Sequence, residues 1–171
     1  MAIPAVCFSG WSNSGKTTLI ARLVRALSGQ GMRVCVIKHT HHALPPDEEG
    51  KDSASFASAG ASTVMLSAPD GVLTRETGEH LLSDLLSRVK NADIILIEGF
   101  EKQACLPVME VRRDKDAPLR APAQVLRAVI TQSPCDLPLP VFSPDDVSGI
   151  AEFVRKLADE QRTSDEGRMQ E

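Results

Sequence analysis

The fold of this 171-residue chain is decided by the stretch Gly10-Trp11-Ser12-Asn13-Ser14-Gly15-Lys16-Thr17. It matches G-x-x-x-x-G-K-[ST], the pattern of a phosphate-binding loop. The two glycines let the backbone curl so that its N–H groups point at a phosphate. We expect Lys16 to bridge the β- and γ-phosphates of a nucleotide and the Thr17 hydroxyl to ligate Mg²⁺. The residues assigned to nucleotide binding are Gly10, Trp11, Ser12, Asn13, Ser14, Gly15, Lys16, Thr17 and Thr18.

The flanking residues have the periodicity that such a loop requires. Residues 5–8 form a short apolar run, typical of a buried parallel strand. After the loop, Ile20, Leu23, Val24 and Leu27 recur at helical spacing. Residues 33–38 then predict a second strand. A strand, a helix and a strand in this order predict a right-handed βαβ unit.

The rest of the chain continues an α/β pattern. We predict the P-loop nucleotide hydrolase fold, a mostly parallel sheet flanked by helices with an antiparallel strand excursion. Further strands are expected over residues 63–67, 72–76, 94–97, 106–113, 125–131 and 140–142. The strand over 106–113 is expected to be exposed or at an edge because it contains Pro107. Thr77 is expected to cap one helix, and Asp145 or Asp146 another.

A single nucleotide-binding domain is expected to span residues 1–158. Residues 159–171 are polar and are expected to form a frayed tail.

A second nucleotide-site signature is Glu98, which follows four aliphatic residues at 94–97. A buried strand of this kind delivers a carboxylate to the edge of the sheet where phosphate and Mg²⁺ lie. We therefore assign Glu98 as catalytic together with Lys16, and we assign Thr17 and Glu98 to the metal. Asp93 lies at the opposite end of the strand and is excluded.

Three of the four histidines, His39, His41 and His42, follow the second predicted strand. The carboxyl ends of strands line the ligand crevice in open α/β sheets. Contact with an anionic ligand, a metal site for zinc or nickel, and a loop without function are all open at this point.

The segment over residues 47–53 is the other open assignment. Asp52 or Ser53 could simply cap the short helix that follows. Alternatively, the segment is a mobile switch that brings Asp52 near Mg²⁺ or its water, which would make Asp52 a third catalytic residue.

Composition excludes several classes of protein. The net charge is −4 and no basic run stands out, which argues against nucleic-acid binding. No apolar stretch reaches the roughly 20 residues needed to span a bilayer, so no membrane association is expected. The first residues lack the charged region of a secretory signal, and the four cysteines form no C-x-x-C pair. We expect a cytoplasmic protein.

Four motifs together resemble the molybdopterin-guanine dinucleotide biosynthesis protein B family. They are the phosphate loop with Thr17-Thr18-Leu19, Ile37-Lys38-His39-Thr40-His41-His42, Gly50-Lys51-Asp52-Ser53 followed by Ala59-Gly60-Ala61, and Ile97-Glu98-Gly99-Phe100. The resemblance runs from about residue 3 to residue 157, which is nearly the whole chain.

The resemblance implies a GTP-binding homodimer with weak GTPase activity. Such a protein would assist the guanylyltransferase that converts molybdopterin to its guanine dinucleotide in molybdenum cofactor biosynthesis. His39, His41, His42 and Lys51 would then lie at the nucleotide or pterin site. A preference for GTP over ATP follows from the resemblance only, because the N-K-x-D signature of many GTPases is absent.

The expected rate of hydrolysis can be argued from the residues. An arginine finger accelerates phosphoryl transfer by about 10³–10⁵. No arginine lies in the phosphate loop or near Glu98 in the sequence, which predicts slow hydrolysis. Three alternatives remain at this point: a metallochaperone-type GTPase that carries nickel on its histidines, a small-molecule kinase with Asp52 as base, and a non-catalytic adaptor.

Overall fold

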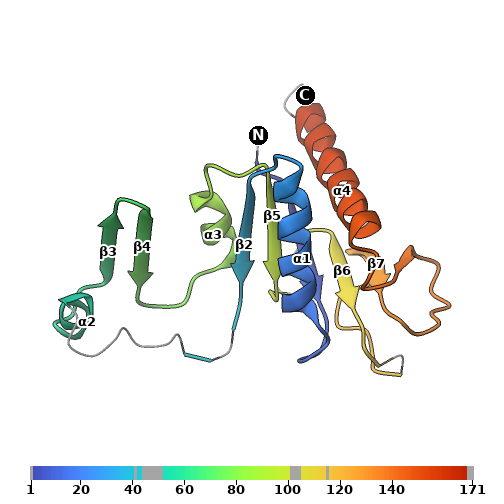
Figure 1. Ribbon diagram of the computed structural model, residues 1–171, viewed down its shortest axis with the longest axis horizontal. Coiled ribbons are helices and arrows are strands. Elements are labelled where there is room, and N and C mark those ends of the chain that lie inside the picture. The colour runs from blue at the N-terminus through green and yellow to red at the C-terminus, as the bar shows by residue number, and fades with distance from the viewer. Residues whose placement is uncertain (1, 41, 44–51, 101–104, 115, 169–171) are drawn as a thin grey trace. The chain divides into compact units, whose positions relative to one another are not determined.

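The apolar runs of the sequence form a six-stranded sheet. Its strands are β1 (Ala5–Ser9), β2 (Val34–Lys38), β5 (Ile94–Glu98), β6 (Val108–Val111), β7 (Leu126–Ile130) and β8 (Val141–Phe142). They pair in the order β2-β5-β1-β6-β7-β8, and each neighbouring pair is parallel (Figure 1). The prediction of a mostly parallel α/β sheet is confirmed.

The computed structural model describes residues 2–40, 42–43, 52–100, 105–114 and 116–168. These residues fall into two compact units, and the assignment of residues 1–158 to a single nucleotide-binding domain stays a prediction. The first unit comprises Met1–His39 with Leu82–Glu171, and the second comprises Thr40–Leu81. His41 and Lys51, two of the predicted ligand-binding residues, lie outside the described residues.

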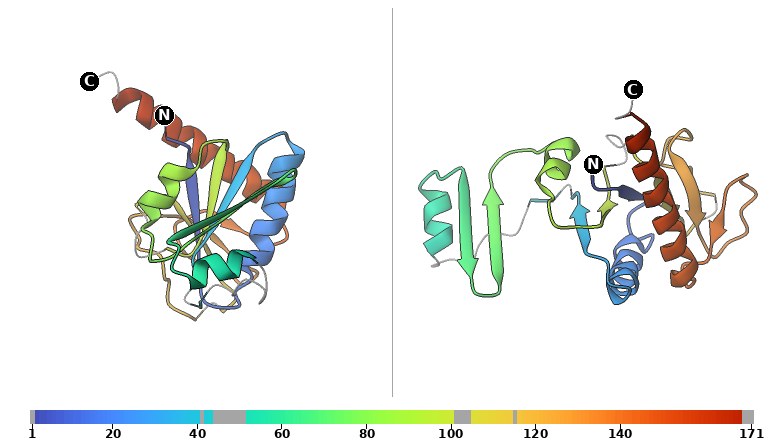
Figure 2. Two further views of the ribbon diagram at one scale, coloured as in Figure 1. Left: turned by 90° about the vertical axis from the view of Figure 1, so that its left-hand side faces the viewer. Right: turned by 90° about the horizontal axis from the view of Figure 1, so that it is seen from above.

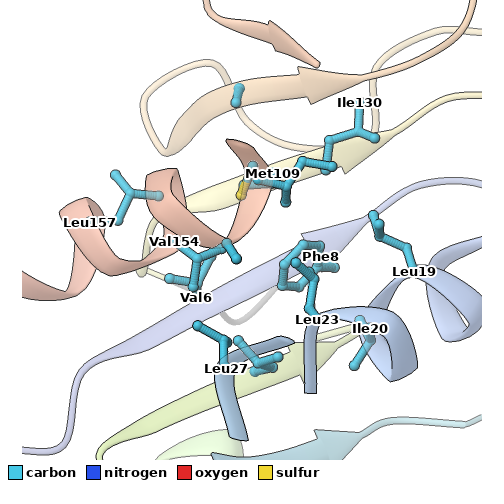
Figure 3. Packing of buried hydrophobic residues seen from close by; sticks show 14 of the residues in the cluster. Val6, Phe8, Leu19, Ile20, Leu23, Leu27, Met109, Ile130, Val154 and Leu157 are labelled. Atoms are coloured by element: carbon cyan, nitrogen blue, oxygen red, sulfur yellow. The ribbon is translucent and has the colours of Figure 1, made fainter. Parts of the chain in front are cut away.

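Helices cover both faces of the sheet in the first unit (Figure 2). α1 (Lys16–Gly29) and α4 (Val147–Arg168) pack on one face, and α3 (Leu82–Arg88) packs on the other. Alternate residues of β1 enter the two cores, with Val6 and Phe8 facing α1 and α4 (Figure 3). Burial on both faces explains why β1 and β5 read as continuous apolar runs.

The prediction of an edge strand around Pro107 was wrong. β6 lies between β1 and β7, and all four of its residues are buried. Pro107 precedes the strand, and its carbonyl accepts a hydrogen bond from the Cys7 N–H at 2.9 Å. A proline at this position removes no hydrogen bond from the ladder, so it does not keep the strand out of the centre.

Two helix ends also differ from the sequence prediction. Thr77 does not cap α3, because its N–H and hydroxyl both donate to the Ser62 carbonyl and the helix begins later, at Leu82. Where we expected a frayed tail from Asp159, α4 continues as helix to Arg168. Gln161 joins this end of the helix to the sheet through the backbone of Ala5.

The start of α4 follows the capping prediction. The Asp146 carboxylate accepts a hydrogen bond from the Gly149 N–H at 2.9 Å. This side chain therefore satisfies one of the N–H groups that the first turn leaves unpaired.

The second unit contains α2 (Asp52–Ser58) and a hairpin of β3 (Thr63–Ala68) and β4 (Gly71–Glu76). Among the residues that the structure describes, these two strands pair only with each other, which confirms the predicted antiparallel excursion. α2 ends before Gly60, whose φ of 102° and hydrogen bond to the Ala57 carbonyl are those of a helix C-terminus.

Asp93, which we excluded from the site, has a structural role at the amino end of β5. The Arg33 guanidinium and the Arg33 N–H both donate to its carboxylate and lower the pKa of Asp93 to about 2. A lowered pKa in the folded state adds stability above the unfolded pKa of about 3.9, and this contribution is lost as the pH falls toward 2.

We therefore expect Asp93→Asn to lower the free energy of unfolding at pH 7. The difference from the unsubstituted chain should shrink as the pH falls from about 4 to 2, because the carboxyl becomes protonated first in the unfolded state and then in the folded state. Urea unfolding of both proteins at a series of pH values measures this difference in the free energy of unfolding. A difference that does not change with pH would contradict this role for the carboxylate.

Candidate functional site: a phosphate-binding cavity

The predicted site lies where three adjacent strands end. β1, β2 and β5 end at Ser9, Lys38 and Glu98. Glu98 is in register with Phe8 of β1 on one side and with Lys38 of β2 on the other. The sheet order therefore brings a carboxylate and an ammonium group to the edge from which the phosphate loop departs.

The loop conformation favours glycine at both glycine positions of the motif, Gly10 and Gly15, because each has a positive φ. Gly10 has a φ of 138°, and a Cβ there would clash with the backbone carbonyl of Val111. Gly15 has a φ of 97° and directly precedes Lys16, the first residue of α1. The loop therefore delivers the N-terminus of α1, with its positive dipole end, to the site.

Lys16 is oriented by the loop itself. Its Nζ donates to the Gly10 carbonyl at 2.8 Å and to the Trp11 carbonyl at 2.7 Å. It lines a cavity of about 420 Å³ formed by residues 12–18 together with Lys38 and Glu98. Two of the three predicted catalytic residues, Lys16 and Glu98, thus share one cavity.

Thr17 and Glu98 are in direct contact in this cavity. The Thr17 hydroxyl lies 2.9 Å from each carboxylate oxygen of Glu98. Only 11% of the Glu98 side chain is exposed, so the carboxylate lies at the buried end of β5. Hydroxyl and carboxylate oxygens are the hard ligands that Mg²⁺ prefers, and these two residues fit the predicted metal site.

Lys38 is a site residue that sequence reasoning missed. Its Nζ lies 3.2 Å from Glu98 Oε1 and donates to the Thr17 hydroxyl at 3.1 Å. The cavity is therefore lined by a second cation besides Lys16. In the sequence, Lys38 is a basic residue at the end of a predicted strand. That position indicates a site residue only once β2 is known to lie beside β5.

The outer side of the loop is braced by the segment that follows β6. The ring N–H of Trp11 donates to the Pro118 carbonyl at 3.0 Å, and the Arg120 guanidinium lies 5.0 Å from the Trp11 ring centroid. Glu110, which is fully buried, accepts the backbone N–H groups of Arg120 and Ala121 at 2.8–3.0 Å. These contacts hold Trp11 in place, and the sequence analysis did not identify Glu110 or Arg120.

Of the predicted ligand-binding histidines, the structure describes His39 and His42, and these two and Asp52 are divided between the two units. In the first unit, the ring centroids of His39 and Phe100 lie 4.5 Å apart, and Phe100 is two residues beyond Glu98. His42 lies in the second unit, where its N–H donates to the Thr40 hydroxyl. Asp52 is the exposed first residue of α2, also in the second unit. Their assignments stay predictions.

The described part of the chain has neither a metal-ligand cluster nor a membrane-spanning helix. Within it, no group of three or more histidine, cysteine, aspartate or glutamate side chains is arranged to hold a metal ion. Over the same residues, no helix is both long enough and apolar enough to cross a bilayer.

The parallel sheet, the glycine-shaped loop and the lysine, threonine and glutamate around one cavity define an α/β protein of the P-loop class. A family model describes the chain more narrowly and matches residues 5–132. The chain belongs to the molybdopterin guanine dinucleotide synthesis protein B family.

Relatives and solved structures agree with this assignment. The molybdopterin-guanine dinucleotide biosynthesis adapter protein of Escherichia coli is 35% identical, covering 89% of this chain and 91% of the relative. The molybdopterin-guanine dinucleotide biosynthesis adapter protein of Haemophilus influenzae is 32% identical, covering 89% of this chain and 88% of the relative. The crystal structure of Bacillus subtilis MobB superimposes with a TM-score of 0.76 at 25% identity, covering 91% of this chain and 98% of that one.

Proposed function

We propose that this chain binds GTP with Mg²⁺, hydrolyses it slowly, and assists a guanylyltransferase that joins GMP to molybdopterin. The observation that carries the proposal is the cavity in which Lys16, Lys38, Thr17 and Glu98 meet beside the phosphate loop. The family to which the chain belongs and the adapter proteins that it resembles support this pathway. We expect this activity in the cytoplasm.

Each cavity residue has a role in the proposed reaction. Lys16 neutralises the β- and γ-phosphates, for which its Nζ leaves the two loop carbonyls that it now contacts. Lys38 adds a second positive charge beside Glu98. Thr17 and Glu98 would hold Mg²⁺, which neutralises charge that develops on the transferred phosphoryl group.

Slow hydrolysis is supported by the composition of the cavity wall. Lysines are the only cations among the described residues that line the Glu98 cavity. An arginine finger supplies about 10³–10⁵ in rate where one is present. We therefore propose that the isolated protein turns over slowly and that its nucleotide state acts mainly on a partner protein.

Glu98→Gln tests the metal assignment. The amide keeps the size of the side chain but removes the charge that binds Mg²⁺, so Mg²⁺ should no longer strengthen GTP binding, and phosphate release should fall by at least about tenfold. Calorimetry with GTP and ATP in competition, with and without Mg²⁺, measures binding. Glu152→Gln, an exposed residue of α4, is the matched control. Undiminished Mg²⁺ dependence in Glu98→Gln would exclude this role.

We propose that the hairpin of the second unit carries homodimerisation. Four large apolar side chains on it are 43–67% exposed: Met65, Leu66, Val72 and Leu73. They occur on both faces of the two-stranded sheet, since Leu66 pairs with Leu73 while Met65 pairs with Thr74. An isolated hairpin is marginally stable in water, and a second copy of the chain would cover these side chains.

Leu73→Asp is therefore expected to convert a dimer to a monomer, because a charge in an apolar interface is left without a partner. Sedimentation equilibrium gives the molecular mass directly. Val141→Asp, which places the same charge on the exposed edge strand β8, should leave the mass unchanged. A dimer that survives Leu73→Asp would place the interface elsewhere.

A further inference from the structure

Lys38 contacts both of the residues that we assign to Mg²⁺. Its Nζ lies 3.1 Å from the Thr17 hydroxyl oxygen and 3.2 Å from Glu98 Oε1. The Thr17 hydroxyl lies 2.9 Å from that same carboxylate oxygen. The ammonium group, the hydroxyl and the carboxylate therefore form a closed triangle of contacts, in which a positive charge already lies against the two oxygen ligands.

We infer that Lys38 and Mg²⁺ compete for Thr17 and Glu98, with the lysine as an internal cation that must move away before the metal binds. The inference rests on the proposed function, because Mg²⁺ and GTP are assigned to this cavity there. The hydroxyl and carboxylate oxygens are ligands of the kind that Mg²⁺ takes. An ammonium group against the same oxygens repels a divalent cation.

The sheet fixes Lys38 beside Glu98. The two residues are in register on neighbouring strands, and the His39 N–H donates to the Glu98 carbonyl at 2.8 Å. Successive side chains of a strand point to opposite faces of the sheet. Glu98 therefore shares a face with Leu96, which is buried in the core on the α1 side. Lys38 extends from this face too, because Val34 of the same strand packs against that core.

The two charged partners differ in burial. Of the Glu98 side chain 11% is exposed, compared with 49% of the Lys38 side chain. A nearly buried carboxylate is costly unless it is paired and hydrogen-bonded. The lysine ammonium lies on a flexible four-carbon stem and can return to solvent. Lys38 is therefore suited both to neutralise Glu98 and to leave it.

Competition predicts how strongly nucleotide binding depends on the metal. An unneutralised Glu98 carboxylate repels the phosphates of GTP in the same cavity, and either Lys38 or Mg²⁺ removes this repulsion. The contributions of the lysine and of the metal to GTP affinity are then not additive, because each does what the other has already done. With Lys38 present, GTP binding should depend less on Mg²⁺ than it does without this lysine.

Lys38→Met tests the competition, because methionine is also unbranched and flexible but carries no charge. Titration calorimetry with GTP should show an affinity about tenfold lower than that of the unsubstituted chain in EDTA, and nearly the same affinity at saturating Mg²⁺. Lys90→Met removes an exposed lysine that precedes the amino end of β5. This matched control should change neither affinity.

A double variant, Lys38→Met with Glu98→Gln, separates the carboxylate from the phosphates as the partner of the lysine. It removes both charges of the pair, so its affinity for GTP in EDTA should return to that of the unsubstituted chain. It also leaves no unpaired carboxylate, so it carries the test if Lys38→Met does not fold. Thermal unfolding of each variant shows whether the chain remains folded.

Other outcomes overturn the inference. Equal losses of GTP affinity in EDTA and in Mg²⁺ for Lys38→Met would mean that the lysine binds the phosphates and does not compete with the metal. A double variant that binds GTP weakly in EDTA would mean the same. An unchanged affinity of Lys38→Met in EDTA would show that Lys38 does not neutralise Glu98. If the unsubstituted chain bound GTP under neither condition, the proposed function itself would fail.

Discussion

Lys16→Ala is expected to lower the affinity for GTP by at least about 100-fold. Removing one partner of a close charge pair costs about 2–5 kcal/mol, and 1.4 kcal/mol corresponds to a factor of ten. Lys16 lines the phosphate cavity and is held there by the carbonyls of Gly10 and Trp11. The same loss is expected for inorganic tripolyphosphate, since Lys16 would contact the phosphates and not the base in the proposed site.

The matched control is Lys156→Ala, which removes an exposed lysine of α4 and should leave nucleotide affinity unchanged. Trp11 is the single tryptophan of the chain and lies in the loop, so its fluorescence follows binding without a label. Retained affinity for GTP in Lys16→Ala would contradict the proposed nucleotide site.

The same variant distinguishes a GTPase cycle from a scaffold. The relatives from Escherichia coli and Haemophilus influenzae are named as adapter proteins, so the two possibilities need to be separated. If Lys16→Ala still assists a guanylyltransferase in assembling the dinucleotide cofactor, the nucleotide is dispensable and the protein acts as a non-catalytic adaptor. If assistance is lost while the dimer and the fold remain, the bound nucleotide is part of the mechanism.

The fold features predicted correctly from the sequence are those that depend on neighbours in the chain, whereas the roles assigned to the site residues stay predictions. The loop at residues 10–17 and the carboxylate at Glu98 each follow a short apolar strand, and the pattern needs no knowledge of the sheet. The hairpin is encoded equally locally, by two apolar runs around Asp70-Gly71. Features that depend on residues close together in the chain can therefore be predicted from one sequence.

The features that were missed depend on strand order. Lys38 becomes a site residue because β2 pairs with β5, and no spacing in the sequence encodes that pairing. Glu110 holds Arg120 against Trp11 because β6 lies beside β1. The error at Pro107 has the same origin, since a proline one residue before a strand looks like a proline within it until the hydrogen bonds are known.

Gly10→Ala is expected to have the largest effect on folding, and Gly15→Ala is its internal control. Both glycines have positive φ, at 138° and 97°, so each alanine adds backbone strain. Only at Gly10 does the new Cβ also meet a backbone carbonyl, that of Val111 in β6, whereas no atom of the described residues lies within 4 Å of the Cβ at Gly15. Strain of this kind costs about 1–3 kcal/mol, and overpacking adds about 1–3 kcal/mol.

We therefore expect Gly10→Ala to lower the free energy of unfolding by about 3 kcal/mol or more, and Gly15→Ala by about 1 kcal/mol. Urea unfolding of the two variants measures the difference. Because the clash pushes the loop away from β6, Gly10→Ala should also lose nucleotide binding under conditions where it is still folded. Equal destabilisation by the two alanines would mean that backbone conformation alone, and not the close approach of β1 to β6, requires glycine at the start of the phosphate loop.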